Sequence, residues 1–248
     1  MSKLIILDAG HGGRDPGALS TTGRRESDDN LRFCLALEPV LVRQGFRVEQ
    51  TRREDVFVSV NDRWAMANRL NADLFYSQHR NSAQRHDANG RPMFNPNGSP
   101  VLNTAAHGVE NWIRNNPSAQ SRAIAEAVLE EWVRVGVQAN RGIRMTGNFG
   151  ILNNARMPAT MTELGFMPNE RDNQLFDQNF DRYVEGAARG ICEFFGVPFN
   201  GEEPRQRARI SLASYVLPEQ EAQMRKHLAQ IRAIPGFEDA WPVITDLE

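Results

Sequence analysis

The chain has 248 residues, of which 40% are hydrophobic and 24% are charged, and its formal net charge is −2. This composition is typical of a soluble globular protein, and the near-neutral charge argues against nucleic acid as a partner. The length suits one large α/β domain with a small appendage. No apolar run reaches the ~20 residues that a membrane-spanning helix needs, so we expect no membrane partner.

The amino terminus and the two cysteines bear on where the protein works. Met1-Ser2-Lys3 leads directly into an apolar run, which indicates that no secretory signal peptide is present. We therefore expect a protein that is made in the cytoplasm and acts after release, unless a leader has been removed. Cys34 and Cys192 both lie in predicted helices, where a free cysteine is typically a small core residue, so no disulfide framework is expected.

Strand and helix patterns alternate along most of the chain. Strands are predicted at 3–8, 47–51, 73–78, 107–112, 149–153 and 159–164, and helices at 28–45, 60–71, 118–136 and 179–195. The first helix is expected to bury one face, made of Leu31, Cys34, Leu35, Leu41 and Val42, and Ser59 is expected to cap the second. The alternation predicts an α/β fold, a largely parallel twisted sheet of about six strands with helices on both faces.

Two segments depart from this alternation. Residues 80–106 are rich in Asn, Pro, Gly and Ser and have no periodicity, which predicts a long loop that is either functional or disordered. Residues 200–208 are polar and predict a linker between a domain at 1–199 and a small α+β tail at 209–248. The tail holds a predicted strand at 209–216 and a helix at 218–231, too little chain for a core of its own.

A glycine-rich stretch follows the first predicted strand and contains His11. Open α/β sheets bind ligands at the carboxyl ends of their strands, and the glycines would let other groups come close to this histidine. Glu26 precedes a helix, while His79 and Glu163 lie at the ends of two further strands. Two histidines and one carboxylate are the ligand set of a catalytic zinc, and a second carboxylate nearby would be a general base.

Each of these residues also has a plainer interpretation. His11 could be a loop histidine that is hydrogen-bonded to the backbone, and Glu26 a surface carboxylate favoured by the helix dipole. His79 could bind a loop carbonyl, and Glu163 could be a structural carboxylate that accepts backbone donors. The four residues together favour the metal site over these separate interpretations.

The segments LDAGHGGRDPGA, RRESDDN, SQHRNS, HGVE and MPATMTELGFMPNERD resemble the zinc-dependent N-acetylmuramoyl-L-alanine amidases of the amidase-3 type. These are cell-wall hydrolases of bacterial autolysins and phage endolysins, and the resemblance covers residues 3–198 in the family's order. It implies that His11, Glu26 and His79 bind Zn²⁺ and that Glu163 is the catalytic base. Arg80 departs from the small residue that is usual there, and it could bind a substrate carboxylate or point to solvent.

The resemblance implies further properties. Asn81 fits a polar position of the family and is predicted, with Arg80, to bind substrate. Glu110 has a family counterpart but is assigned no chemistry. Apart from the resemblance, His86 and His107 could bind a metal in principle, but a solvated loop residue and a strand-start residue are the favoured interpretations. The tail weakly resembles the first strand and helix of a peptidoglycan-binding sporulation repeat.

The implied reaction is hydrolysis of the amide bond between N-acetylmuramic acid and L-alanine in peptidoglycan, by a zinc-activated water and a glutamate base. The expected enzyme is a monomer that acts on the cell wall after its release, in phage lysis or mother-cell lysis. Three alternatives remain: a zinc peptidase of the carboxypeptidase kind, a non-catalytic wall-binding module, and a phosphate-binding loop protein. The last is weak because no Gly-Lys-Ser/Thr follows the glycines.

Overall fold

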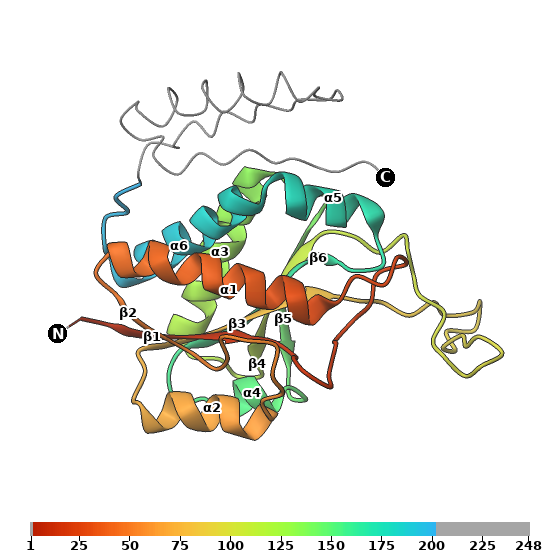
Figure 1. The fold of residues 1–248 in the computed structure, drawn as a ribbon, viewed down its shortest axis with the longest axis horizontal. Coiled ribbons are helices and arrows are strands. Elements are labelled where there is room, and N and C mark those ends of the chain that lie inside the picture. Colours follow the sequence, from red (N-terminus) through yellow and green to blue (C-terminus); the bar gives the residue numbers. More distant parts are fainter. Residues whose placement is uncertain (1, 202–248) are drawn as a thin grey trace, which may run out of the picture. The chain divides into compact units, whose positions relative to one another are not determined.

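A computed structural model describes residues 2–201 of the protein. Its centre is a six-stranded sheet in the order β2-β1-β3-β6-β4-β5 (Figure 1). The strands are β1 Leu4–Ala9, β2 Arg47–Gln50, β3 Leu74–Asn81, β4 Val109–Arg114, β5 Asn140–Thr146 and β6 Ala159–Phe166. β2, β1, β3 and β6 are mutually parallel, whereas β4 is antiparallel to β6 and carries β5 parallel to itself.

Helices cover both faces of the sheet (Figure 1). One face packs against α1 Glu26–Arg43, α3 Ala119–Val135, α5 Glu170–Gln178 and α6 Phe180–Phe195, and the other against α2 Val60–Arg69 and α4 Gly150–Asn153. Each face therefore has its own apolar cluster, the larger around Phe33, Trp132 and Ile191 and the smaller around Phe75, Ile151 and Met161. This architecture confirms the predicted α/β class and the largely parallel sheet.

Some local predictions are wrong. The apolar run at 149–153 predicts a strand, but Gly150–Asn153 is the short helix α4, whose Ile151 and Leu152 are buried against the α2 side of the sheet. A short apolar run is compatible with either state, so periodicity alone does not decide between them. The sequence pattern predicts neither strand β5 nor helix α5. β5 is an edge strand whose residues are all exposed or half-buried, and it lacks the apolar run that marks a central strand.

The predicted buried face of α1 is partly wrong. Cys34 and Leu41 are buried, as expected, but Leu35 and Val42 are exposed. Phe33 and Leu37 are buried in their place and belong to the larger apolar cluster. Ser59 does cap α2, since its side chain accepts a hydrogen bond from the Asp62 amide. Cys192 is also buried, so both cysteines are core residues as predicted.

The predicted loop after β3 is ordered as a small arm that projects from the domain (Figure 1). Isolated bridges pair Gln84 with Leu102, His86 with Pro92, and Phe94 with Pro100. Backbone hydrogen bonds between these segments give the arm its own local structure although it lacks a regular helix or strand.

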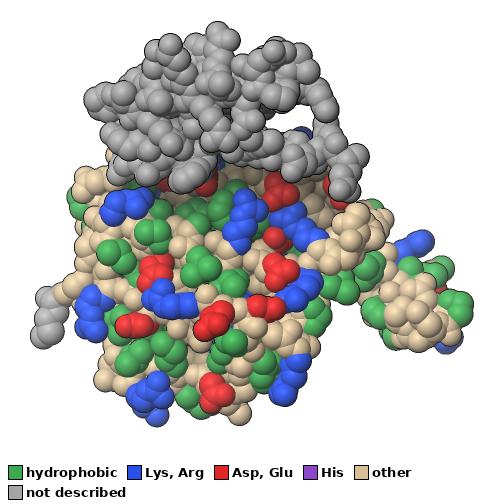
Figure 2. All heavy atoms as spheres, viewed as in Figure 1, with side chains coloured by type: hydrophobic (Ala, Val, Ile, Leu, Met, Phe, Trp, Pro, Cys, Tyr) green, Lys and Arg blue, Asp and Glu red, His purple; other side chains and the backbone are tan. Residues whose placement is uncertain are grey.

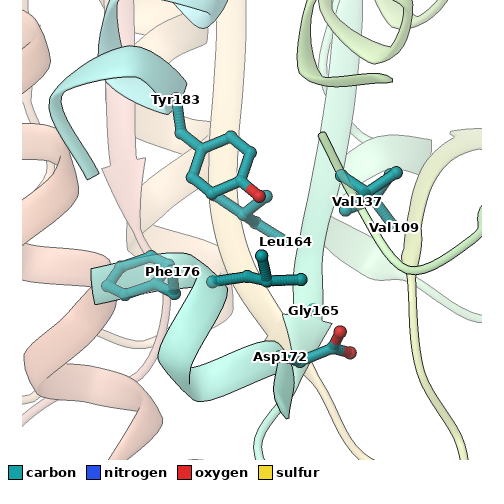
Figure 3. A pocket seen from close by; sticks show the side chains of 8 residues that line it. Val109, Val137, Leu164, Gly165, Asp172, Phe176 and Tyr183 are labelled. Carbon is teal, nitrogen blue, oxygen red and sulfur yellow. The ribbon is translucent and has the colours of Figure 1, made fainter. Parts of the chain in front are cut away.

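A small internal pocket lies on the α5 and α6 side of β6 (Figure 3). It is lined by Leu164, Phe176 and Tyr183 together with Val109, Val137, Gly165, Asp172 and Leu175. Asp172 accepts hydrogen bonds from the backbone amides of Gly108 and Phe166, at 2.9 and 2.8 Å, and thereby ties α5 to the strand ends. Successive strand residues point to opposite faces, so Leu164 lines this pocket while Glu163 faces the other side of the sheet.

The surface carries both signs of charge. Figure 2 shows basic and acidic side chains next to one another on the face that α1 presents. The ion pairs on and near this helix include Arg24 with Asp177 at 2.7 Å and Arg25 with Asp55 at 2.7 Å. Within residues 2–201, no helix has both the length and the apolar character needed to cross a membrane.

The predicted linker and tail are outside this description. The first compact unit of the chain ends at Phe199, shortly after α6 ends at Phe195. Most of the predicted linker at 200–208 and the whole predicted segment at 209–248 lie outside the described residues. The domain boundaries and the resemblance of the tail therefore stay predictions.

Candidate functional site

The structure brings His11, Glu26 and His79 together at one edge of the sheet. His11 follows β1, Glu26 is the first residue of α1, and His79 lies near the end of β3. β1 and β3 are parallel neighbours, with Ala9 opposite Gln78, so their carboxyl ends place the two histidines side by side. One potential ligand atom from each residue lies within 4.8 Å of the other two.

Glu26 lies between the two histidine rings. Its Oε1 is 2.8 Å from His79 Nδ1 and 3.3 Å from His11 Nε2. The same carboxylate accepts hydrogen bonds from the backbone amides of Ala18 at 2.8 Å and Arg80 at 3.1 Å. A carboxylate held at this many points has little freedom to turn away from the histidines.

Glycines allow this close approach. A Cβ atom on Gly10 would collide with the imidazole of His79. A Cβ on Gly17, which has a φ of +67°, would lie 2.7 Å from Glu26 Oε2 and 2.7 Å from His11 Cδ2. The glycines around His11 therefore give room to the side chains of His11, Glu26 and His79, which explains the glycine-rich sequence without a phosphate-binding role.

A second group of residues orients the cluster. His11 Nδ1 lies 2.8 Å from Asp15 Oδ2, an arrangement that fixes the ring of a metal-binding histidine and leaves its Nε2 toward the centre. Asn30 Nδ2 donates to Glu26 Oε1 at 3.2 Å from one turn further along α1. Asp15 and Asn30 are not among the predicted site residues, although Asp15 lies in the same glycine-rich motif.

Two buried arginines hold the loop that carries His11. Arg52 donates to the carbonyls of Ala9 and Gly10 at 2.8 and 2.9 Å, and Arg63 donates to the carbonyl of His11 at 2.7 Å. Arg63 also forms an ion pair with Asp8 at 2.9 Å, with both side chains buried. Sequence reasoning misses these arginines because a lone arginine in a loop or on a helix is typically a surface charge.

The electrostatics of the cluster suit a cation. Burial alone would favour the neutral ring of His11, but hydrogen bonds and charges from Glu26 and Asp15 outweigh it and raise the pKa of His11 to about 9. Burial would likewise favour the neutral form of Glu26, but His11 and His79 lower its pKa well below its usual range. The group of two histidines and a carboxylate therefore concentrates negative potential where a divalent ion would sit, and its donor set fits one.

Glu163 lies in β6 directly opposite His79 of β3. Its side chain faces the cluster from a buried position, with 9% of the residue exposed. Its Oε2 has no hydrogen-bond partner among the residues that the structure describes. Burial, followed by the charges of Glu26 and Glu110, raises the pKa of Glu163 well above its ordinary value. A buried carboxyl group with an unsatisfied oxygen and a raised pKa is well placed to exchange a proton with a ligand.

Glu110 is the neighbour of Glu163 on the other side, across β4 and β6. It accepts hydrogen bonds from Asn81 Nδ2 at 2.8 Å, Trp112 Nε1 at 3.1 Å and Arg141 Nε at 2.7 Å. Asn81, which is predicted to bind substrate, is half-buried and uses its amide to hold Glu110. The sequence signal that could have found Glu110 is its place after a Gly-Val pair at the start of a strand.

Arg80 does not lie where either sequence-based interpretation places it. Its guanidinium is completely buried and binds Asp29 at 2.6 Å and the carbonyl of Leu164 at 3.0 Å. It also stacks over the Phe176 ring, with 4.4 Å to the ring centroid. Because successive strand residues face opposite sides, Arg80 points into the α1 and α5 side, away from His79. It therefore neither reaches a substrate nor points to solvent.

The remaining histidines lie apart from this cluster. His107 is exposed and its Nδ1 lies 2.8 Å from the Ala105 carbonyl oxygen, and His86 lies exposed in the projecting arm. Within residues 2–201, the only group of side chains that could hold a metal ion is His11, Glu26 and His79.

Comparison with known proteins bears on what this site does. Curated relatives from two staphylococcal species carry the name "Probable cell wall amidase LytH". The one from Staphylococcus saprophyticus is 26% identical over 197 residues, which are 78% of this chain and 58% of the relative. The one from Staphylococcus aureus is 28% identical over 184 residues, which are 73% of this chain and 54% of the relative. The chain thus spans a little over half the length of these relatives.

Solved structures match over a larger share of their length. The catalytic domain of CwlV, an N-acetylmuramoyl-L-alanine amidase from Bacillus (Paenibacillus) polymyxa var. colistinus, superposes with a TM-score of 0.66 at 29% identity and covers 79% of this chain and 99% of that domain. An N-acetylmuramoyl-L-alanine amidase from Clostridium difficile 630 gives 0.66 at 30% identity, over 79% and 97%. Residues 5–193 match the N-acetylmuramoyl-L-alanine amidase family model. The chain belongs to the N-acetylmuramoyl-L-alanine amidase family.

Proposed function

We propose that this protein is a zinc-dependent enzyme that hydrolyses the amide bond between N-acetylmuramic acid and L-alanine in peptidoglycan. The observation that carries the proposal is the position of Glu163, whose unsatisfied carboxyl oxygen lies on the strand next to His79. The family match and the names of the relatives support the substrate class.

His11, Glu26 and His79 are the proposed zinc ligands. Two histidines and one carboxylate leave a coordination position open for water or substrate, as in other catalytic zinc sites. A zinc ion held there would lower the pKa of a bound water and polarise the scissile carbonyl. Asp15 and the backbone amides on Glu26 keep the ligands in place before substrate arrives.

Glu163 is the proposed general base. Its raised pKa allows its carboxylate to take a proton from the attacking water and to hold it within the buried site. Oε2 then donates the same proton to the nitrogen of L-alanine as the amide bond breaks. Because this oxygen has no competing partner among the described residues, it is free to make both contacts in turn.

The alternatives predict different products. A zinc peptidase of the carboxypeptidase kind would release terminal amino acids, whereas a wall-binding module would release nothing. Metal ligands and a buried base in one cluster disfavour the binding module, because burying an unsatisfied carboxyl group without a chemical role is costly.

The test joins metal content to activity. The protein is stripped with a chelator, assayed for new amino groups released from purified peptidoglycan, and reloaded with Zn²⁺ or Mg²⁺. The proposal predicts no release after stripping and recovery with about one equivalent of Zn²⁺ but not with Mg²⁺, which prefers oxygen ligands. Unchanged release by the stripped protein would contradict it.

The proposal extends to where the enzyme works. It acts on the cell wall, as an autolysin or an endolysin, and Asn81 remains a proposed substrate contact through its half-buried amide. Recovery of the protein in the wall fraction of lysed host cells, together with loss of wall density, would support this placement.

A further inference from the structure

A row of charged side chains continues from the metal cluster across the sheet. His79 lies opposite Glu163, and Glu163 lies opposite Glu110. Residues directly opposite in a sheet point to the same face, so the three share the α2 and α4 side. Glu110 in turn binds Arg141 of the edge strand β5. The row thus leads from a proposed metal ligand to a pair of arginines.

Arg141 and Arg144 converge on one carboxylate. The Nε atoms of Arg141 and Arg144 lie 2.7 and 3.7 Å from the same oxygen, Glu110 Oε2. With one carboxylate between two guanidinium groups, this end of the row carries a net positive charge. By contrast, the charge of Arg25 near the cluster is balanced, since it contacts both Asp28 and Asp55.

The arginines are arranged to bind a further anion. Both direct Nε toward Glu110, and Arg141 Nη1 also donates to the His107 carbonyl at 3.5 Å, which leaves the other terminal nitrogens of the two guanidinium groups for a further partner. The side chains are 34% and 48% exposed, and Arg141 is held in place by the Phe166 ring, 4.9 Å from its guanidinium carbon. A partly exposed, pre-positioned guanidinium pair is suited to a carboxylate, which it can bind through parallel hydrogen bonds.

The distance from Arg141 and Arg144 to the reacting bond near Glu163 matches the reach of an extended stem peptide. Neighbouring strands lie ~4.8 Å apart, so β5 is ~10 Å from Glu163 on β6. An extended peptide advances ~3.5 Å per residue, so the second residue after the scissile bond reaches ~7 Å, and an arginine side chain spans the remainder. On the substrate, the glycan side of the bond is largely uncharged, whereas the peptide side carries carboxylates.

We propose that Arg141 and Arg144 form a carboxylate-binding site that recognises a free carboxylate on the second residue of the stem peptide. The inference rests on the proposed function and deepens it, because it states that the stem peptide of the substrate binds on the β4 and β5 side of the site. Glu110 is then a positioning residue that holds the two guanidinium groups together.

The test uses two synthetic muramoyl tripeptides whose second residue is a side-chain-linked glutamate. They differ only in whether the α-carboxyl group of that residue is free or amidated. The zinc-loaded wild type is expected to have a kcat/KM at least about tenfold higher for the free acid, mainly through KM, since one charge-assisted hydrogen bond supplies such a factor. In Arg144→Gln this ratio should fall to about one, and in Arg144→Glu it should fall below one.

The matched control is Arg189→Gln, which removes the same charge from α6 on the opposite face of the sheet and should keep the wild-type ratio. Melting temperature and zinc content show that each variant is folded. Equal kcat/KM of the wild type on both tripeptides, or an unchanged ratio in Arg144→Gln and Arg144→Glu, overturns the inference and leaves the proposed function standing. Cleavage of neither tripeptide by the zinc-loaded wild type overturns both.

Discussion

Replacing Glu163 by glutamine separates the chemical role of this residue from its effect on stability. Glutamine has nearly the same shape but cannot accept and return a proton, so Glu163→Gln should lower kcat by at least ~100-fold, the lower bound for a positioned general base. The zinc ligands are untouched, so zinc content should stay at the wild-type value. Loss of activity with full zinc content distinguishes a base from a ligand.

The same substitution should stabilise the metal-free protein. The pKa of Glu163 is raised above 4.5 in the folded state, mainly by burial and then by the charges of Glu26 and Glu110. A group with a raised folded pKa loses stability as the pH rises from its unfolded pKa through its folded pKa. Glutamine does not titrate, so the variant avoids this loss, and its amide can donate to the surrounding carboxylates.

The size of the effect follows from linkage. Each unit by which the folded pKa exceeds the unfolded one costs the wild type about 1.4 kcal/mol once the pH is above both. For a domain of this size that corresponds to a difference of about 3–6 °C in melting temperature per unit. Thermal unfolding in the presence of a chelator, from pH 4 to pH 8, measures the difference. A melting-temperature difference between Glu163→Gln and the wild type that does not grow with pH, or near-normal turnover by the variant, would refute the reasoning.

Other substitutions test other parts of the account. His79→Ala should remove most bound zinc and all activity, as measured by metal analysis and amine release, whereas the control His86→Ala in the arm should keep both. Full zinc content in His79→Ala would contradict the assignment of His79 as a ligand. Arg63→Met should lower the free energy of unfolding by about 3–5 kcal/mol in urea titrations, because it leaves the buried charge of Asp8 unpaired. A loss below ~1 kcal/mol would show that the Arg63–Asp8 pair contributes little to stability. Gln84 and Leu102 already lie side by side, so the domain should tolerate replacement of residues 84–102 by a tight turn with little change in melting temperature. The replacement should instead change KM or substrate preference. Identical kinetics on several peptidoglycan types would show that the arm has no role in recognition.

The sequence is most informative where local pattern and chemistry agree. Apolar runs predict the central strands, and the glycine-rich motif points to His11 because close backbone approach needs glycine. Strand-end placement and the resemblance predict that His79 and Glu163 meet, but their direct opposition depends on β3 and β6 being neighbours although they are far apart in sequence. Strand order is a property of the packed sheet, which no local pattern encodes.

The wrong prediction for Arg80 and the missed Arg141 have a common physical cause. Arg80 is expected near the substrate because it follows His79, yet strand alternation turns it to the opposite face, where Asp29 neutralises its charge. Arg141 escapes sequence-based prediction because β5 is a half-exposed edge strand without an apolar run. In both cases the function of a charged side chain depends on its partner across the fold, and the sequence alone does not reveal that partner.

The most direct test of the central account is the identity of the bond that is cleaved. Purified peptidoglycan is digested with the zinc-loaded protein, and the soluble and glycan fractions are analysed by mass spectrometry, with Glu163→Gln as the control. The account predicts stem peptides that begin with a free L-alanine amino group, glycan strands whose muramic acid carries a free lactyl carboxylate, and neither product from the control. Single amino acids released from the peptide ends, or intact muropeptides, would contradict it.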